Sequence, residues 1–452
     1  MTALGPAVYR ELRFLVIDDQ PVARDSLRIC AQTMGAFAVE FSSGYQDAIV
    51  RIRRAMPDVI LCDYLLGNDR SGQQLLEELR RFDMLADDCV FIMVTAEQSY
   101  EQVVAAVELA PDDYIIKPFS PDRLKLRLDR VLRRKRFFKP LFAAKRAQDY
   151  AGAARFIEQV RDTEEGQVQR FELMRQHAEV LLLKGDALAA QAAFESILET
   201  HPFPWARAGK ARALVGQSRL QEARAIMDQV VVDAPTFFGG FDLKAQICLE
   251  MGDYEEGQRT VAAASSKTGR NYVRKRLLAD AALLSGDTAT ACAAMGDVVR
   301  NDTAPGAVSV ADCLMLARSH VEAGELMEAE QALGGISAAR METASLDDKA
   351  SWHALRALMA PDAERRQVAA LRAAWIATPL CAQTRVDIIR AAFALGDQAL
   401  AVAITSALFV SDEIRRVFKV VRGLFEAHAM VPAFRELQRS AALQKIGVAD
   451  ES

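Results

Sequence analysis

The first third of the chain alternates between two patterns of apolar positions. Short apolar runs rich in branched and aromatic side chains predict five buried strands, over Phe14–Ile17, Phe37–Phe41, Val59–Cys62, Val90–Val94 and Tyr114–Ile116. Each run is followed by a stretch with helical spacing. This alternation predicts a doubly wound α/β domain over residues 10–136, with a parallel sheet and helices on both of its faces.

The pattern changes near Lys139–Pro140. Beyond this point β-branched runs disappear, and alanine-rich helical patterning continues to the C-terminal end. We therefore expect a linker over residues 137–147 and an all-α helical-repeat solenoid over residues 148–440, which we call the helical array.

Turn-forming residues recur through the helical array at intervals of 33 to 38 residues, at Gln148, Gly185, Ser218, Gly252, Gly286, Gly324, Pro361 and Gly396. Small residues stand five positions after these markers, at Ala153, Ala190, Ala223, Gly257, Ala291, Ala329 and Ala401, with Arg366 as the exception. A second set stands seven positions before the markers, at Ala178, Ala211, Ala245, Ala279, Ala317 and Ala354. This periodicity predicts stacked helical hairpins, because small residues let paired helices approach closely and each marker ends a first helix.

The hairpin pattern resembles the tetratricopeptide repeat family over about residues 141–430. Pro202 and Pro235 lie seventeen residues past their markers, where that family ends its second helix. The large aromatic residue that the family usually has early in the first helix is replaced, at Met174, Arg207 and Lys275. The resemblance implies an array that binds other proteins, and it leaves the number of repeats open.

Composition narrows the classes of function. The 452 residues are too many for one hydrophobic core, and a net charge of -5 offers no general attraction for nucleic acid. Seven scattered cysteines without a CxxC pair fit a reducing compartment. We find no signal-peptide pattern and no apolar run of membrane-spanning length, so we expect a cytoplasmic protein without a membrane partner.

Polar residues directly follow four of the predicted strands. Asp18 and Asp19 follow the first strand, Asp63 the third, Thr95 the fourth and Lys117 the fifth. The carboxyl ends of parallel strands meet at one edge of a sheet, so these side chains should converge. Clustered carboxylates favour a bound Mg²⁺ ion, and a lysine and a hydroxyl beside them suit an anion. The combination predicts phosphoryl transfer onto a carboxylate, forming an acyl phosphate.

This ordered set closely resembles the receiver domain of two-component response regulators, over about residues 12–136. The resemblance implies that Asp63 accepts a phosphoryl group from a histidine kinase or phosphotransfer protein. It also implies a Mg²⁺ site formed by Asp18, Asp19, Asp63 and the backbone carbonyl of Leu65.

The same resemblance assigns the remaining residues of the site. Lys117 would pair with the phosphoryl oxygens, and its peptide bond to Pro118 would be cis. Thr95 would hydrogen-bond the phosphoryl group, and Tyr114 would be the aromatic switch that turns inward when Thr95 moves. The sequence departs from the family at Gly67, which stands where many receivers have proline. It departs again at Gly72, which comes one residue later than the usual glycine.

The segment Arg123–Arg136 contains eight basic residues with leucine and valine between them. It can be read as a surface for nucleic acid or an acidic partner. The interpretation we favour is the solvated face of the last receiver helix, since the interleaved apolar residues form a stripe that would be buried. An exposed stripe would instead indicate a homodimer or an interdomain surface.

We expect no enzyme activity of the protein's own. The five histidines share no metal-ligand spacing, and neither a Walker loop nor an H-E-x-x-H motif is present. The main hypothesis is a phosphorylation-controlled switch that regulates protein–protein interactions through the helical array. The alternatives are a response regulator that binds nucleic acid through the basic segment, and a kinase-modulating adaptor or phosphate sink.

Overall fold

The computed structural model describes residues 5–67, 71–81, 84–96, 111–268, 271–300, 308–411 and 413–450. The chain forms two compact units. The first unit comprises residues 1–240 with 267–271, and the second comprises 241–266 with 272–452.

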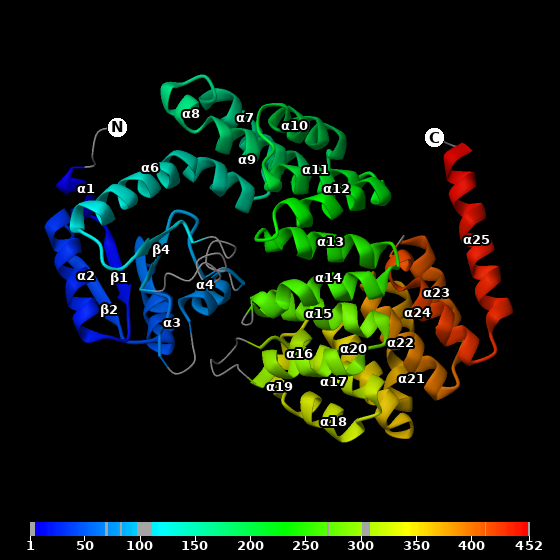
Figure 1. Cartoon of the computed structure of the whole chain (residues 1–452). Helices are drawn as coiled ribbons and strands as arrows, with labels where there is room; N and C mark the ends of the chain where they lie inside the picture. The colour runs from blue at the N-terminus through cyan, green and yellow to red at the C-terminus, as the bar shows by residue number, and fades with distance from the viewer. Residues whose placement is uncertain are drawn as a thin grey trace. The chain divides into compact units, whose positions relative to one another are not determined.

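The first unit begins with the predicted α/β domain. Five parallel strands follow the order β2-β1-β3-β4-β5. They are β1 (Arg13–Ile17), β2 (Ala38–Ser42), β3 (Val59–Asp63), β4 (Val90–Thr95) and β5 (Asp113–Ile116). The helices of this domain are α1 (Pro6–Arg10), α2 (Pro21–Met34), α3 (Tyr45–Arg54), α4 (Gly72–Arg81) and α6 (Pro121–Arg146), as Figure 1 shows. The helix predicted between the fourth and fifth strands lies outside the described residues.

The central strands are buried because helices cover the sheet. Every residue of β3 and β4 is buried, as expected for a strand enclosed on both faces. On one face, Leu27 of α2 and Leu128 of α6 pack with Val16 and Leu61 in a single core. The predicted doubly wound architecture is therefore confirmed for the described strands and helices.

Helix α6 replaces the linker that we expected over residues 137–147. It runs for 26 residues without a break, with Pro140 inside it. Its first half belongs to the α/β core through Leu128 and Leu132. Its second half buries Phe138 and Leu141 in a core shared with α7 (Tyr150–Val160) and α9 (Arg170–Leu183). A proline removes only one backbone donor, and the apolar burial on either side of it favours continuation of the helix.

Helical hairpins fill the rest of both units, as predicted (Figure 1). The first unit contains α8 (Glu164–Val168), α10 (Ala187–Thr200), α11 (Pro204–Gly216) and α12 (Leu220–Asp233). α13 (Phe238–Glu250) and α14 (Tyr254–Lys267) include the boundaries between units. The second unit continues with α15 (Tyr272–Ser285), α16 (Thr288–Arg300), α17 (Val310–Ala323), α18 (Leu326–Gly334), α19 (Ala338–Glu342), α20 (Leu346–Met359), α21 (Pro361–Ala377), α22 (Ala382–Leu395), α23 (Gln398–Val410), α24 (Ile414–Ala427) and α25 (Val431–Asp450).

The turn markers have a common backbone conformation. All of them except Pro361 have positive φ, from 56° at Gln148 to 85° at Gly286. This left-handed residue ends the first helix of a hairpin and turns the chain toward the second. Pro361 instead begins α21, where its restricted φ suits the first helical position. Ala429, between α24 and α25, has φ 57° and is a further turn of this kind that the sequence pattern did not reveal.

The small residues of the repeat lie where the paired helices meet. Twelve alanines of the two predicted sets are fully buried, namely Ala153, Ala178, Ala190, Ala211, Ala223, Ala245, Ala279, Ala291, Ala317, Ala329, Ala354 and Ala401. At Gly257, an added Cβ would lie 2.9 Å from Cδ2 of Leu249, so even alanine would not fit without a shift. Arg366, the exception in the pattern, is exposed.

Aspartates next to the turn markers cap the second helices. Asp149, Asp186, Asp287 and Asp397 each accept a hydrogen bond from the backbone N–H three residues later. Such a cap satisfies a donor that the first turn of a helix leaves unpaired. These capping aspartates are a second local signal of the repeat, in addition to the spacing of the turn markers and the small residues.

None of the helices in the described part of the chain is both long enough and apolar enough to cross a membrane.

Substitution by alanine should have opposite effects at two glycines of the second unit, one in a left-handed turn and the other inside a helix. Nothing lies within 4 Å of an added Cβ at Gly286 (φ 85°) or at Gly423 inside α24. Gly286→Ala should therefore destabilise the protein by about 1 kcal/mol through backbone strain alone. Gly423→Ala should stabilise it by up to about 1 kcal/mol through helix propensity. Urea unfolding followed by circular dichroism measures both, and equal shifts in the two variants would contradict the assigned turn.

Candidate functional site

Three carboxylates meet at the carboxyl edge of the sheet. β1 and β3 are neighbours, with Ile17 opposite Cys62, so the residues that follow, Asp18 and Asp63, lie side by side. Asp18, Asp19 and Asp63 each offer an oxygen within 4.8 Å of the others. Asp18 and Asp63 are buried, whereas Asp19 is exposed to solvent. The predicted convergence of these three residues is therefore confirmed.

Lys117 reaches the same place from the end of β5. Its Nζ donates to Oδ2 of Asp18 at 2.7 Å and to Oδ2 of Asp63 at 3.3 Å. Its backbone N–H donates to the carbonyl oxygen of Thr95 at 2.7 Å, which ties the loop after β5 to the end of β4. The peptide bond between Lys117 and Pro118 is cis, as the resemblance implied.

Backbone groups orient the two buried carboxylates. The N–H of Gln20 donates to Oδ1 of Asp18 at 2.9 Å, and the N–H of Tyr64 donates to Oδ1 of Asp63 at 2.8 Å. In each carboxylate the other oxygen, Oδ2, faces Lys117. Both side chains are thus held in one orientation, with one oxygen each turned toward a shared space.

Burial and charge oppose each other in this cluster. Burial raises the pKa of Asp63, and the neighbouring Asp18 adds to the rise while Lys117 works against it. Burial alone would lower the pKa of Lys117, but its contacts with Asp18 and Asp63 outweigh that effect and raise it. The ammonium group of Lys117 therefore bonds to two of the three clustered carboxylates. The excess of negative charge and the all-oxygen donor set fit a hard divalent cation.

The other predicted site residues lie on β4, on β5 and in the loop after β3. Thr95 is the last residue of β4 and is buried, and Tyr114 lies half-buried in β5. Leu65 follows Asp63 by two residues and pairs with Ser71 in a short antiparallel bridge, with its side chain exposed.

Both glycine departures have a structural reason. Gly67 has φ 67°, a conformation closed to proline, and an added Cβ there would lie 3.3 Å from Oδ2 of Asp19. Gly72 begins α4, where a Cβ would lie 2.2 Å from the carbonyl oxygen of Asp63. Gly72 therefore lets the start of α4 approach the end of β3 directly. Residues 68–70 between them lie outside the described residues.

Sequence reasoning missed Arg24 as a supporting residue. Its guanidinium donates to the backbone carbonyl oxygen of Asp18 at 2.6 Å from the second turn of α2. Six residues separate the two, but an arginine this close to an aspartate is common and carries no special signal in the sequence.

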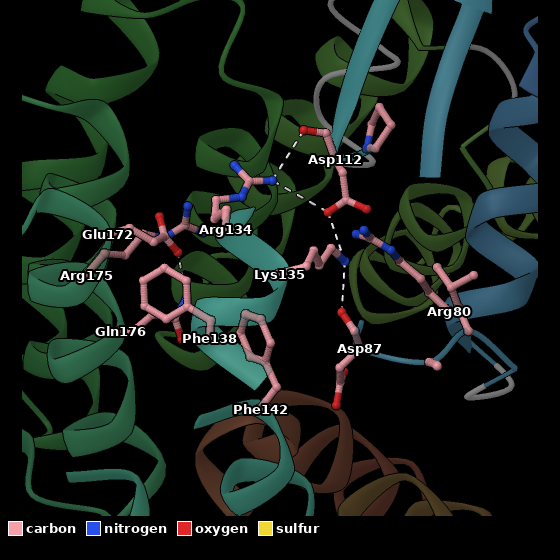
Figure 2. A pocket seen from close by; sticks show the side chains of 13 residues that line it. Arg80, Asp87, Asp112, Arg134, Lys135, Phe138, Phe142, Glu172, Arg175 and Gln176 are labelled. Atoms are coloured by element: carbon pink, nitrogen blue, oxygen red, sulfur yellow. Dashed lines mark hydrogen bonds and ion pairs between the residues drawn. The ribbon is translucent and has the colours of Figure 1, made fainter. Parts of the chain in front are cut away.

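The basic segment of α6 forms ion pairs near the opposite, amino edge of the sheet. Arg127 and Arg130 pair with Asp113, at 2.6 and 2.8 Å. Arg134 and Lys135 pair with Asp112, and Lys135 also donates to the carbonyl oxygen of Asp87 (Figure 2). Leu128 and Leu132 are buried, as expected for the favoured interpretation, whereas Leu126 is exposed.

A cavity of about 530 Å³ lies beside these ion pairs, between α6 and α9 within the first unit. Phe138 and Phe142 of α6 and Gln176 of α9 line it (Figure 2). Arg80 of α4 lines the same cavity. The α/β domain and the first hairpins thus meet at the edge of the sheet away from the three carboxylates.

Comparison with known proteins identifies the first domain. Residues 14–129 match the response regulator receiver domain family. The phosphate regulon transcriptional regulatory protein PhoB of Escherichia coli (strain K12) is 36% identical over 122 residues, which cover 27% of this chain and 52% of PhoB. The probable transcriptional regulator ycf27 of Guillardia theta is 33% identical over 122 residues, covering 27% of this chain and 46% of the relative. The chain thus spans about half the length of the curated relatives it matches.

Two solved structures are also similar to this chain. NtrX from Brucella abortus, in complex with ATP, is 25% identical with a TM-score of 0.26 and covers 28% of each chain. A tetratricopeptide repeat protein from Parabacteroides merdae ATCC 43184 is 10% identical with a TM-score of 0.39. It covers 60% of this chain and 98% of its own.

The α/β domain is therefore a response regulator receiver domain, followed by helical repeats. A receiver domain indicates phosphorylation-regulated signalling in a two-component system.

The raised pKa of Asp63 predicts how its charge affects stability. Because the folded-state pKa lies above the ordinary value of 3.8, the ionised carboxylate disfavours folding at neutral pH. In Mg²⁺-free buffer, Asp63→Asn should therefore raise the thermal midpoint at pH 7. This gain should disappear as the pH falls toward 3.8, where Asp63 becomes protonated.

Thermal unfolding across that pH range measures the effect, with Asp47→Asn as a control. Asp47 is a partly exposed carboxylate of α3 that pairs with Arg51. If Asp63→Asn instead had a lower thermal midpoint than wild type at pH 7, the stabilisation by the ion pair with Lys117 would exceed the cost of burying the carboxylate.

Proposed function

We propose that this protein is a two-component signalling switch in which Asp63 accepts a phosphoryl group and the helical array carries the response to a protein partner. The donor would be a histidine kinase or a phosphotransfer protein. The observation that supports this most is the placement of Asp18, Asp19, Asp63 and Lys117 around one space at the carboxyl edge of the sheet.

Asp63 is suited to act as the nucleophile. An oxygen of its carboxylate would attack the phosphorus of a phosphohistidine, a P–O bond would form, and the P–N bond to the imidazole would break. A Mg²⁺ ion held by Asp18, Asp19, Asp63 and the carbonyl of Leu65 would neutralise charge on the phosphoryl oxygens. Lys117 would move from the carboxylates to a phosphoryl oxygen, and the hydroxyl of Thr95 would donate to another.

The position of Lys117 suggests how the signal leaves the site. Phosphorylation adds about 1.5 to 2 negative charges beside its ammonium group near neutral pH. Lys117 lies four residues before the start of α6, and its backbone is hydrogen-bonded to Thr95. A shift of Lys117, Thr95 and the switch residue Tyr114 would therefore act on the first turn of α6.

Helix α6 can pass that shift on, because two cores share it. Leu128 and Leu132 are buried in the receiver, and Phe138 and Leu141 are buried against α7 and α9. A helix with both halves packed in this way moves as one piece. The proposed output is a change in protein binding by the helical array, without enzyme activity of its own.

The alternatives share the receiver chemistry and differ in output. A nucleic-acid-binding output through α6 has less support, because Arg127 and Arg130 are paired with Asp113. An adaptor that modulates its own kinase, or a phosphate sink, would use the same site, and its partner would be the kinase.

Incubation with acetyl phosphate and Mg²⁺ tests the acceptor. Wild-type protein should gain about one acid-labile phosphate per chain, and Asp63→Asn should gain none because the nucleophile is absent. The control Asp47→Asn, which alters an aspartate of α3 away from the site, should label like wild type. Equal labelling of Asp63→Asn and wild type would remove Asp63 as the acceptor.

Hydrogen exchange tests transmission through α6. Beryllofluoride with Mg²⁺ mimics the phosphoryl group, so adding it should change amide exchange in α7 and α9 of the wild type. Asp63→Asn should show no such change, since it cannot form the adduct. Exchange that changes only within residues 12–120 of the wild type would contradict transmission into the helical array.

A further inference from the structure

Three different metal-binding side chains meet in the second unit, far along the chain from the receiver. Cys292 lies on α16, His320 on the last turn of α17, and Glu325 at the position that precedes α18. Nδ1 of His320 is 3.6 Å from Sγ of Cys292 and 2.7 Å from Oε2 of Glu325. One donor atom from each residue lies within 4.8 Å of the other two.

The two contacts of His320 use the same ring nitrogen, so Cys292 and Glu325 both face one donor atom. Nδ1 either donates to Glu325 or accepts from the thiol of Cys292, and it cannot do both at once. A nucleophile–base–acid relay has a different arrangement, because there the base uses one ring nitrogen for the nucleophile and the other for the carboxylate. Three donor atoms that converge on one space are what a bound cation requires.

In two other repeats, the equivalent positions form a hydrogen bond between successive hairpins. Six residues past its turn marker, Gln191 accepts from Arg219 of the next hairpin, and Gln258 donates to Asp287 of the next hairpin. Cys292 and Glu325 occupy the corresponding pair of positions in the following repeat. This repeat thus has a thiol and a carboxylate where those two repeats have an amide and its charged partner.

Glu325 also differs from three aspartates at equivalent positions, which cap the helices that follow them. Asp186, Asp287 and Asp397 each cap the helix that follows them, but Glu325 makes no side-chain cap to α18. Its longer side chain reaches back to His320 instead. Helix α18 therefore lacks a stabilising side-chain cap from this residue, and the Glu325 carboxylate lies beside the thiol of Cys292 and the imidazole of His320.

We propose that Cys292, His320 and Glu325 form a binding site for a divalent transition-metal ion, with Zn²⁺ as the preferred ion. Thiolate, imidazole and carboxylate are its usual ligands, and a tetrahedral Zn²⁺ places sulfur and nitrogen ligands roughly 3.6 Å apart. The sulfur and nitrogen of Cys292 and His320 already have that separation. The nitrogen–oxygen distance must open from 2.7 Å to roughly 3.3 Å around such an ion. The half-exposed side chain of Glu325 can make that move.

The site has three protein ligands, which leaves the fourth position of a tetrahedral ion for water or for a ligand from a partner. It also joins successive hairpins, because Cys292 belongs to one and His320 with Glu325 to the next. Bound metal would therefore stabilise the second unit, since an unfolded chain does not hold the three groups together.

Calorimetric titration of the full-length protein with Zn²⁺ tests the site. The protein is first stripped with a chelator and then kept in excess Mg²⁺, which occupies the oxygen ligands of the receiver. Wild type should bind one Zn²⁺ per chain and melt at a higher temperature with it. With Co²⁺ as a spectroscopic probe, it should show sulfur-to-cobalt charge transfer and the strong visible bands of tetrahedral coordination.

Matched variants separate this site from adventitious binding. Cys292→Ala and His320→Gln should each weaken Zn²⁺ binding by more than about tenfold, and Cys292→Ala should abolish the sulfur-to-cobalt band. Cys381→Ala removes an exposed thiol, and His353→Gln removes another histidine paired with a glutamate, so both should bind like wild type. The proposal is overturned if wild type binds no Zn²⁺ under these conditions, or if Cys292→Ala binds as tightly as wild type. Neither result bears on phosphorylation of Asp63, which is measured separately.

Discussion

The receiver depends on a single electrostatic constraint, the burial of Asp18 and Asp63 side by side with one ammonium group to balance them. Burial disfavours a carboxylate, and a second carboxylate nearby disfavours it further. Lys117 offsets part of this electrostatic cost because its ammonium group donates hydrogen bonds to both carboxylates. A cation and an incoming phosphoryl group would change the balance again. Each such change would alter what Lys117 contacts, and the proposed switch rests on this charge imbalance.

The fold connects this edge to the rest of the first unit through α6. The helix begins four residues after Lys117, crosses the receiver core and ends in the core of the first hairpins. Ion pairs from Arg134 and Lys135 to Asp112 hold its middle to the opposite edge of the sheet. The receiver core and the core of the first hairpins therefore share one helix, α6.

The helical array is built from a repeated local device, and its exceptions are informative. Left-handed turns, caps and buried alanines recur because every hairpin meets the same packing requirement. Glu325 stands in place of a capping aspartate, and its side chain contacts His320 instead of capping α18. In the receiver, Gly67 is also a departure from the usual pattern, and its positive φ is a conformation that proline cannot adopt.

The sequence by itself determined the five strands, the residues at their carboxyl ends and most turns of the helical array. These features are local, because apolar periodicity and turn chemistry are properties of short segments. The sequence was misleading at Pro140. A proline usually ends or kinks a helix, but here the burial of Phe138 and Leu141 favours continuation of α6. Only the tertiary structure decided which carboxylates the arginines of α6 meet, and that Cys292 lies beside His320, 28 residues away. Such contacts depend on how helices pack, and packing joins residues whose spacing along the chain follows no period.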